Sequence, residues 1–335
     1  MHPRGPGAFR KRLSAPPSRA AIAIAWLLVA FWAGWALVRA LGLDRGWPLV
    51  PMIAFTPYVA ATAVIPVAVA ALLRRWGAVA VATAAALLLV GLVLPRAFSD
   101  GEAAAGSGVP LNVMTANLHF GEADPAPVVE LVRAHRIDVL SVQELTPGLA
   151  VELRRAGLER ELPHGTERAA PTAHGSGIYS RYPLTAIGPA RRRPGAFFMP
   201  TARIAIRGYG RLEVTAVHPP PPTSPGTVRD WRTDLAAMPS AVGSPLRMLL
   251  GDFNATLDHD HMRDLIARGY RDAADSAGSG LTPTWSAARI PLLPFRVPLT
   301  IDHLLVDERI GVRQVGVHDL PGSDHDAVTG ELLLP

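Results

Sequence analysis

The sequence predicts an α/β domain that follows three apolar helices. Residues 1–100 contain three long apolar runs, whereas the chain after residue 109 alternates short strand-like runs with amphipathic segments. Several strand-like runs end directly at a polar side chain. Alternation of this kind is typical of helices packed on β-sheets. The expected helical segments are Val128–Arg136, Pro147–Ala156, Thr227–Met238 and His261–Arg268.

Positive charge is concentrated in the first hundred residues, which contain ten Lys or Arg and two Asp. The rest of the chain contains 23 basic and 26 acidic residues, so the high net charge does not indicate a nucleic-acid-binding surface on the C-terminal region. The chain has no cysteine, which excludes a disulfide framework, a thiolate metal site and a cysteine nucleophile.

Three apolar runs follow a basic N-terminal arm. Residues 1–19 are rich in Pro, Gly and Arg, which predicts a disordered arm. The runs cover Ala20–Val38, Leu49–Leu73 and Gly77–Leu94. Each is long enough to cross a bilayer as a helix, and none has a polar face. A cleaved signal peptide or a buried helical hairpin is the alternative, but the length and number of the runs favour three transmembrane helices within residues 20–98.

Basic residues flank the apolar runs unevenly, which predicts the orientation of a multi-pass protein in the cell membrane. With the N-terminus in the cytoplasm, seven basic residues lie inside and three lie outside. Three crossings then place the C-terminal domain outside the cytoplasm. Residues 99–108 are small and polar and are expected to form a flexible linker, so the predicted domain covers residues 109–335.

The domain begins with two strand-like runs that each lead to a polar side chain. Leu111–Ala116 leads to Asn117, and Ile137–Val142 leads to Glu144 just past its end. A glutamate immediately after a buried strand favours a hard divalent cation, because the buried charge needs compensation. The alternative is that the N-terminus of the helix from Pro147 stabilises this charge.

A histidine marks the end of a later strand. Leu212–Val217 ends at His218, which four prolines follow, and these exclude both a helix and a central paired strand. A lone histidine is more often structural. At a strand end before a rigid turn, however, it suits phosphate contact or protonation of a leaving group.

The stretch Leu249–Thr256, LLGDFNAT, carries the most specific local signal. Its apolar half suits a buried strand, which Gly251 ends at a tight turn. Asp252 and Asn254 can then point into one site and hold a water molecule and a phosphoryl oxygen. The alternative is an Asx turn, in which Asp252 only caps the following loop.

Two carboxylates and a histidine occur near the C-terminus. Ile301 opens a strand with Asp302 near its start, and Asp324 and His325 follow a later strand. A carboxylate that accepts a hydrogen bond from an imidazole fixes its tautomer and raises its basicity. Before this strand, residues 290–299 form an apolar, proline-punctuated loop that either packs on the sheet or contacts a bilayer surface.

These strand-end motifs, in chain order, resemble the endonuclease/exonuclease/phosphatase family of metal-dependent phosphodiesterases, here as a membrane-anchored bacterial type. The resemblance covers Leu111–Leu334 and rests on MTANLHFG, VLSVQELTP, VTAVHPPPP, GDFN, TIDHLLV and GSDHDAV. It implies a four-layer α/β sandwich, in which two mostly antiparallel sheets pack face to face with helices outside. It also implies a Mg²⁺ or Mn²⁺ cofactor whose ligands are Asn117, Glu144 and Asp324.

The resemblance further implies hydrolysis of a phosphoester by in-line attack of water. Asp252 would orient or deprotonate the water, and Asn254 and His218 would bind the phosphoryl group. His325, paired with Asp302, would act as acid, base or phosphate ligand. Whether Asp252 or His325 is the general base stays open.

The sequence leaves the substrate open, because loops rather than the core set specificity in such folds. Nucleic acid is the first expectation, since nuclease activity is widespread in the family. A sphingomyelinase-like or phospholipase C-like activity on lipid headgroups is the second, with the bilayer as a partner. A non-catalytic, membrane-anchored binding module is the alternative of a different class. No protein partner is evident from the sequence.

Overall fold

The computed structural model describes residues 17–101, 108–188, 194–243, 245–286 and 296–335. The chain divides into two compact units. One contains the helices α2, α4, α5 and α6. The other consists of Gly42–Phe55 together with Leu94–Pro335. The predicted arm over residues 1–19 and the predicted linker over residues 99–108 fall largely outside the described residues.

The first unit is entirely helical. Its helices are α2 (Arg19–Leu41), α4 (Thr56–Ala61), α5 (Val64–Leu72) and α6 (Trp76–Val93). Among the described residues, two helices are long and apolar enough to cross a membrane, Arg19–Leu41 and Trp76–Ala97. Both helices lie within predicted spans. Their assignment as candidate spans rests on length and composition alone.

The second predicted span, Leu49–Leu73, is not one helix, so only two of the three predicted spans are single long apolar helices among the described residues. Its first part forms α3 (Leu49–Ile53) in the other unit, and only a shorter apolar stretch, Thr56–Leu72, remains. Proline explains the breaks, because it lacks an N–H and fits only the first turn of a helix. Pro57 and Pro66 lie in the first turns of α4 and α5.

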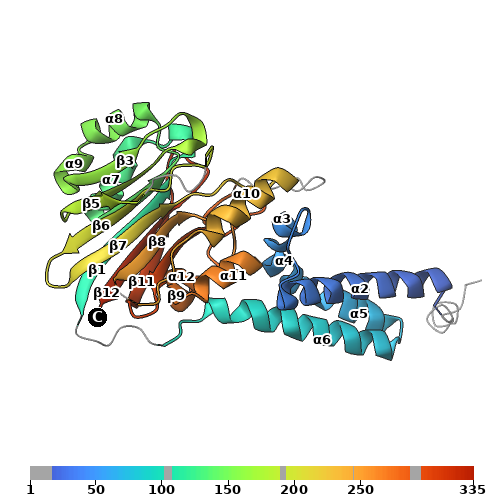
Figure 1. Ribbon diagram of the computed structural model, residues 1–335. Coiled ribbons are helices and arrows are strands. Elements are labelled where there is room, and N and C mark those ends of the chain that lie inside the picture. Colours follow the sequence, from blue (N-terminus) through green and yellow to red (C-terminus); the bar gives the residue numbers. More distant parts are fainter. Residues whose placement is uncertain (1–16, 102–107, 189–193, 244, 287–295) are drawn as a thin grey trace, which may run out of the picture. The chain divides into compact units, whose positions relative to one another are not determined.

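Two six-stranded sheets form the second unit (Figure 1). The first has the order β11-β12-β1-β2-β4-β3, and the second has the order β5-β6-β7-β8-β10-β9. In each sheet one pair is parallel, β1 with β2 and β7 with β8, and the other pairs are antiparallel. The strands are β1 (Val109–Asn117), β2 (Val139–Gln143), β3 (His164–Arg168), β4 (Ser176–Ser180), β5 (Leu184–Ile187), β6 (Thr201–Ile206), β7 (Gly210–Val217), β8 (Leu246–Asp252), β9 (Tyr270–Asp272), β10 (Asp302–Asp307), β11 (Gly311–His318) and β12 (Ala327–Leu334).

Alternating side chains along the strands fill two different apolar layers. Val113 and Val139 belong to the core between the two sheets, which also contains Val214 and Leu250. Their neighbours along the strands, such as Met114, face the helices instead. This alternation follows from the period of two in a β-strand.

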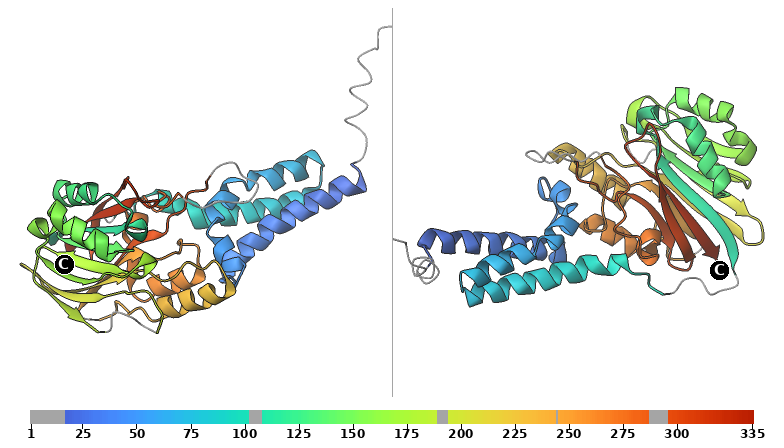
Figure 2. Two further views of the ribbon diagram at one scale, coloured as in Figure 1. Left: turned by 90° about the horizontal axis from the view of Figure 1, so that it is seen from above. Right: turned by 180° about the vertical axis from the view of Figure 1, so that it is seen from behind.

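Helices cover the outer face of each sheet, which makes the unit an α/β sandwich (Figures 1 and 2). The first sheet packs against α7 (Pro125–Ala134), α8 (Pro147–Ala156) and α9 (Leu158–Glu161). The second packs against α10 (Pro225–Ala236) and α11 (Asp260–Ile266), and α12 (Ala273–Ser276) follows β9. The remaining short helices are η1 (Leu94–Ala97), η2 (His119–Gly121) and η3 (Thr172–His174).

The stretch Gly42–Phe55 takes part in the core of this unit. Val50 is fully buried in the apolar cluster that also contains Trp231 and Phe253. Ala54 packs with Val297 at the end of the predicted apolar loop 290–299, of which residues 290–295 lie outside the described residues. The described end of that loop therefore packs within the protein.

Candidate active site

The strand topology brings the predicted site residues to one edge of the sandwich. Asn117 is the last residue of β1, and Glu144 lies one residue past the end of β2, which is parallel to β1. In the second sheet, His218 follows β7 and Asp252 ends the parallel strand β8. Because β10 runs antiparallel to β8, its first residue, Asp302, lies opposite Asp252. Parallel strands thus explain why polar residues at successive strand ends meet.

The loop before β12 completes the set with Asp324 and His325. Its position is fixed by Ser323, whose hydroxyl donates to the backbone oxygen of Asn117 at 2.8 Å and accepts from the backbone N–H of His325 at 3.0 Å. The structure therefore brings all eight predicted residues together, and we refer to them as the strand-end cluster: Asn117, Glu144, His218, Asp252, Asn254, Asp302, Asp324 and His325.

Asp252 lies at the centre of the strand-end cluster. Its Oδ2 accepts from Asn117 Nδ2 at 3.0 Å and lies 3.7 Å from His218 Nε2 and 3.8 Å from His325 Nε2. Its Oδ1 accepts from the backbone N–H of Asn254 at 2.7 Å. Asp252 thus forms the Asx turn that the sequence left open, and it also faces the cluster. Burial, together with neighbouring carboxylates, raises its pKa to about 7 although His325 opposes this.

Glu144 is held by the segment that follows β1. Its Oε2 accepts from the backbone N–H of Phe120 at 2.6 Å, and its Oε1 accepts from Asn117 Nδ2 at 3.3 Å. Burial raises the pKa of Glu144, and these two hydrogen bonds oppose that rise. The cap of α8 is Thr146, whose side chain accepts from the backbone N–H of Leu149. The hydrogen bonds of Glu144 thus go to Phe120 and Asn117, and the cap of α8 is a different residue.

His325 and Asp302, 23 residues apart, form a direct pair. His325 Nδ1 lies 2.9 Å from Asp302 Oδ2, which also accepts from the hydroxyl of Thr284 at 2.7 Å. Burial lowers the pKa of His325, but Asp302 and the other nearby carboxylates outweigh burial and raise it to about 10. The ring is therefore protonated at neutral pH in this arrangement.

The second histidine of the cluster has the opposite electrostatic environment. Burial, and then the charge of His325, lowers the pKa of His218 to about 3. Its Nε2 lies 3.6 Å from Glu144 Oε1. Asn254 adopts a left-handed backbone conformation, with φ of 47°, and its Nδ2 donates to the backbone oxygen of Pro219 at 3.0 Å. The loop after β8 is therefore tied to the proline turn after β7.

Several residues that contact the cluster were not singled out as site residues from the sequence. His119 Nδ1 lies 2.7 Å from Asp324 Oδ1, and Trp285 Nε1 donates to Asp324 Oδ2 at 2.9 Å. His119 has φ of 43°, in the left-handed region, which is strained for a residue with a side chain. Its place two residues after Asn117, in the NLHFG motif, was the available signal.

The sequence of residues 114–325 matches the Endonuclease/Exonuclease/phosphatase family, which is more than half of the chain. The chain belongs to this family. The family expected from the strand-end motifs is thereby confirmed. The two mixed sheets with helices outside agree with the sandwich that the family resemblance implied.

Solved structures of the Endonuclease/Exonuclease/phosphatase family share this fold at low sequence identity. The protein from Beutenbergia cavernae is 20% identical, with a TM-score of 0.52, over 67% of this chain and 72% of its own. The protein from Bacteroides vulgatus is 16% identical, with a TM-score of 0.51, over 68% and 100%. The same fold occurs in D. rerio TDP2, in complex with a single-strand DNA product, at 15% identity, with a TM-score of 0.50, over 67% and 98%. No curated protein sequence matches the chain.

The donor groups of the site fit the divalent cation that the family uses. Asp252, Asp302 and His325 are buried, and each can place one donor atom within 4.8 Å of the other two. Asp302 Oδ1 is buried without a hydrogen-bond partner among the described residues. Carboxylate oxygens are the donors that Mg²⁺ and Mn²⁺ prefer. A buried group that could bind a metal is therefore present.

The predicted metal ligand Asn117 has a different contact pattern from the one expected. Its Nδ2 donates to Glu144 and Asp252, and its Oδ1 accepts from the backbone N–H of His119 at 3.0 Å. In this arrangement Asn117 orients two carboxylates, rather than directing its amide oxygen into the cluster.

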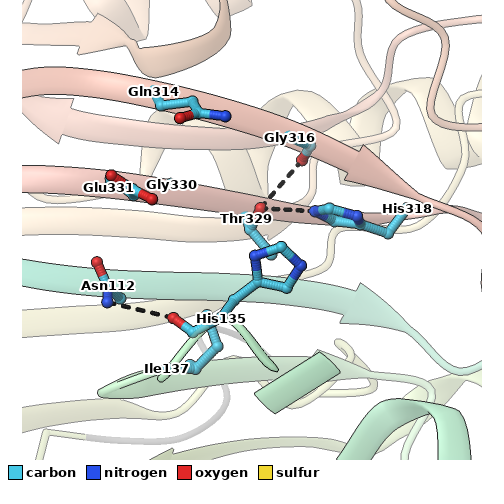
Figure 3. Close-up of a pocket in the computed structure, with 9 residues that line it drawn as sticks. All are labelled: Asn112, His135, Ile137, Gln314, Gly316, His318, Thr329, Gly330 and Glu331. Carbon is cyan, nitrogen blue, oxygen red and sulfur yellow. Dashed lines mark hydrogen bonds between the residues drawn. The ribbon is translucent and has the colours of Figure 1, made fainter. Parts of the chain in front are cut away.

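A separate small cavity lies on the first sheet (Figure 3). Its volume is about 40 Å³, too small for a nucleotide or a lipid headgroup. The rings of His135 and His318 are 4.3 Å apart there, and His318 Nε2 lies 2.9 Å from Thr329 Oγ1. None of its lining residues belongs to the strand-end cluster. They are Asn112, His135, Ile137, Gln314, Gly316, His318, Thr329, Gly330 and Glu331.

Proposed function

We propose that the protein is a metal-dependent phosphoesterase whose active site is the strand-end cluster. The main support is the position of Asp252, whose carboxylate lies within 4 Å of His218, His325 and Asn117 at the meeting of the two sheets. Family membership adds support, since the family consists of metal-dependent phosphoesterases and nucleases. The four-layer order of the family and a catalytic domain within residues 109–335 are part of this proposal.

Glu144 and Asp324 are the proposed metal ligands. Asn117, expected as a third ligand, instead orients Glu144 through its amide N–H. A cation there compensates the buried charge of Glu144, whose pKa burial otherwise raises. When bound, Mg²⁺ or Mn²⁺ offsets negative charge on the phosphoryl oxygens.

The pKa values of the protein groups give each of them a different role in proton transfer and hydrogen bonding. Asp252, with a pKa of about 7, can accept a proton from an attacking water near neutral pH. His325, kept protonated by Asp302, presents a positive charge and an N–H to a phosphoryl oxygen. His218 stays neutral, because its pKa is about 3, and orients the same group through hydrogen bonds. In this proposal Asn254 is a further phosphoryl ligand.

The substrate class that we place first is a nucleic-acid phosphodiester. The support comes from the family and from the fold shared with D. rerio TDP2, whose structure contains a single-strand DNA product. A phospholipid headgroup is the second candidate. One observation favours a lipid substrate: two helices are long and apolar enough to cross a bilayer. In both cases we propose a multi-pass membrane protein whose catalytic domain lies outside the cytoplasm.

A substrate screen tests the proposal. The full chain, purified in detergent, is incubated with single-strand DNA, RNA, sphingomyelin and phosphoinositides, with Mg²⁺, with Mn²⁺ and with a chelator. We expect turnover of at least one substrate that the chelator abolishes. Binding of a substrate without any turnover would contradict the proposal and favour a non-catalytic binding module, and turnover in the presence of chelator would contradict the metal dependence.

A further inference from the structure

The loop after β8 carries Asp252 and Asn254 and is held at several points. We refer to Asp252–Asp258 as the catalytic loop. Trp231 Nε1 donates to the backbone oxygen of Phe253 at 2.9 Å. His303 Nε2 lies 2.8 Å from the backbone oxygen of Ala255. At the far end of the loop, Arg263 Nη1 donates to the backbone oxygen of Asp258, and a further group binds the Asp258 carboxylate.

That group is Arg96, which comes from a distant part of the sequence. Arg96 lies in η1, directly after the apolar helix α6, and 162 positions before Asp258. Its Nη1 and Nη2 donate to the two carboxylate oxygens of Asp258 at 2.8 and 2.7 Å. Arg96 is 6% exposed and Asp258 is 0% exposed. The backbone oxygen of Arg96 accepts from the N–H of Gly280 at 3.1 Å, so both its main chain and its guanidinium are held.

A buried, bidentate pair of this kind fixes geometry more than it adds stability. The two parallel hydrogen bonds define both the distance and the plane of the carboxylate. The cost of removing two charges from water offsets most of their attraction, and well-packed apolar residues often serve stability equally well. The position of this pair at the end of the catalytic loop therefore indicates a role in placing the loop.

The conformation of Asn254 connects this pair to the chemistry. Asn254 has φ of 47°, a left-handed conformation that asparagine adopts more readily than most residues with a side chain, and its Nδ2 contact with the backbone oxygen of Pro219 supports it. From Asp258 the constraint passes through Thr256, whose Oγ1 accepts from the backbone N–H of Asp258 at 3.3 Å. If the Asp258 end is released, the loop can relax and Asp252 and Asn254 shift.

We propose that Arg96 is a positioning residue of the active site, which acts through Asp258 on the catalytic loop. The proposal rests on the proposed function for its effect on turnover, but its effect on the loop can be measured without any activity. Arg96, directly after an apolar helix, would thereby influence phosphoester hydrolysis at the strand-end cluster.

The test uses the full chain in detergent and four variants. Arg96→Met removes the guanidinium, and Arg96→Lys keeps a charge but loses the bidentate geometry. The double variant Arg96→Met/Asp258→Asn also removes the carboxylate charge that Arg96 offsets. The control is Arg203→Met, which breaks a different ion pair of the same unit, with Glu213 at 2.7 Å, on β6 and β7. For each protein, kcat, KM, thermal stability and hydrogen exchange of the catalytic-loop amides are measured.

We expect Arg96→Met to lower kcat by about 10- to 100-fold with little change in KM, because small misplacements of catalytic groups have effects of this size. Faster hydrogen exchange should be confined to the catalytic loop. Arg96→Lys should recover part of kcat. The double variant should recover thermal stability, because the buried carboxylate charge of Asp258 is gone. It should not recover kcat, because Arg96 no longer holds the catalytic loop. Arg203→Met should match the unsubstituted protein in kcat.

Two results would overturn the positioning role. One is an Arg96→Met variant with unchanged loop exchange. The other is a double variant whose kcat recovers together with its stability, which would make the pair purely structural. A protein without turnover on any substrate contradicts the proposed function instead, and the exchange measurement still decides the role of Arg96.

Discussion

The pair of Asp302 and His325 allows a quantitative prediction, because one contact dominates the electrostatics of the ring. Asp302→Asn keeps the shape of the side chain and removes the charge next to His325 Nδ1, at 2.9 Å. His325→Ala removes the ring itself. If the two residues act as one unit, the double variant should lose little more activity than the worse single variant.

The size of the effect follows from the raised pKa of His325, which is about 10. Relative to a free histidine, the protonated ring is favoured by about 5 kcal/mol, at about 1.4 kcal/mol per pKa unit. Among the groups that raise this pKa, Asp302 has the largest effect. If it supplies somewhat more than half, Asp302→Asn removes about 3 kcal/mol of this preference, which changes the ratio of protonated to neutral His325 by roughly 100-fold.

The assay is a double-variant cycle of kcat and thermal stability, with a pH profile of each protein. A raised pKa means that the protonated form of His325 is lost only as pH rises towards about 10, so Asp302→Asn should move the alkaline loss of activity to lower pH. Additive losses of kcat would refute the reasoning. Unfolding that accounts for the lost activity, or an unchanged alkaline limb in Asp302→Asn, would refute it too.

Three further predictions concern the metal, acid stability and membrane topology. Glu144→Gln should lower both Mg²⁺ binding and turnover while the fold survives, and normal turnover would exclude Glu144 as a ligand. Burial lowers the pKa of His259 to about 4, and its Nδ1 accepts from the N–H of Thr256 at 2.9 Å. The unfolded state therefore binds more protons below about pH 6.5, and the free energy of unfolding should fall by up to about 3 kcal/mol towards pH 4. Denaturant titrations should show a smaller fall in the free energy of unfolding for the His259→Asn variant. A reporter fused after Pro335 should be active outside the cytoplasm and one after Arg75 inside, and a C-terminal region protected from protease in spheroplasts would contradict this.

The sequence was sufficient to locate the strand-end cluster because its signals are local. A run of apolar residues that stops at Asn117, His218 or Asp252 marks a strand end directly. Parallel pairing then brings such ends to one edge without any further information. The family resemblance supplied the pairing of Asp302 with His325, which no local pattern requires.

Long-range contacts were beyond what local patterns indicate. The pair of Arg96 with Asp258 joins residues that are 162 positions apart. In the sequence Arg96 only marks the end of the third apolar run, and no local pattern singles out Asp258. The apolar run Leu49–Leu73 was continuous in hydropathy, so only its tertiary contacts reveal that Val50 belongs to the cluster with Trp231. The amide of Asn117 points its nitrogen to the carboxylates, an orientation that depends on His119 two residues later.

The inclusion of Gly42–Phe55 in the sandwich unit has a consequence for truncation. A shortened chain that starts at residue 109 lacks both Val50 and Arg96. It would have an apolar cavity beside Trp231 and Phe253, and the buried carboxylate of Asp258 would lose the guanidinium of Arg96. Loss of one member of a buried ion pair alone destabilises a protein by about 3–5 kcal/mol, a large part of the stability of a typical domain. The helices between Thr56 and Val93 thus interrupt the sequence of the sandwich unit, and a shortened form of this protein would need to keep both Gly42–Phe55 and the chain from Leu94 onward.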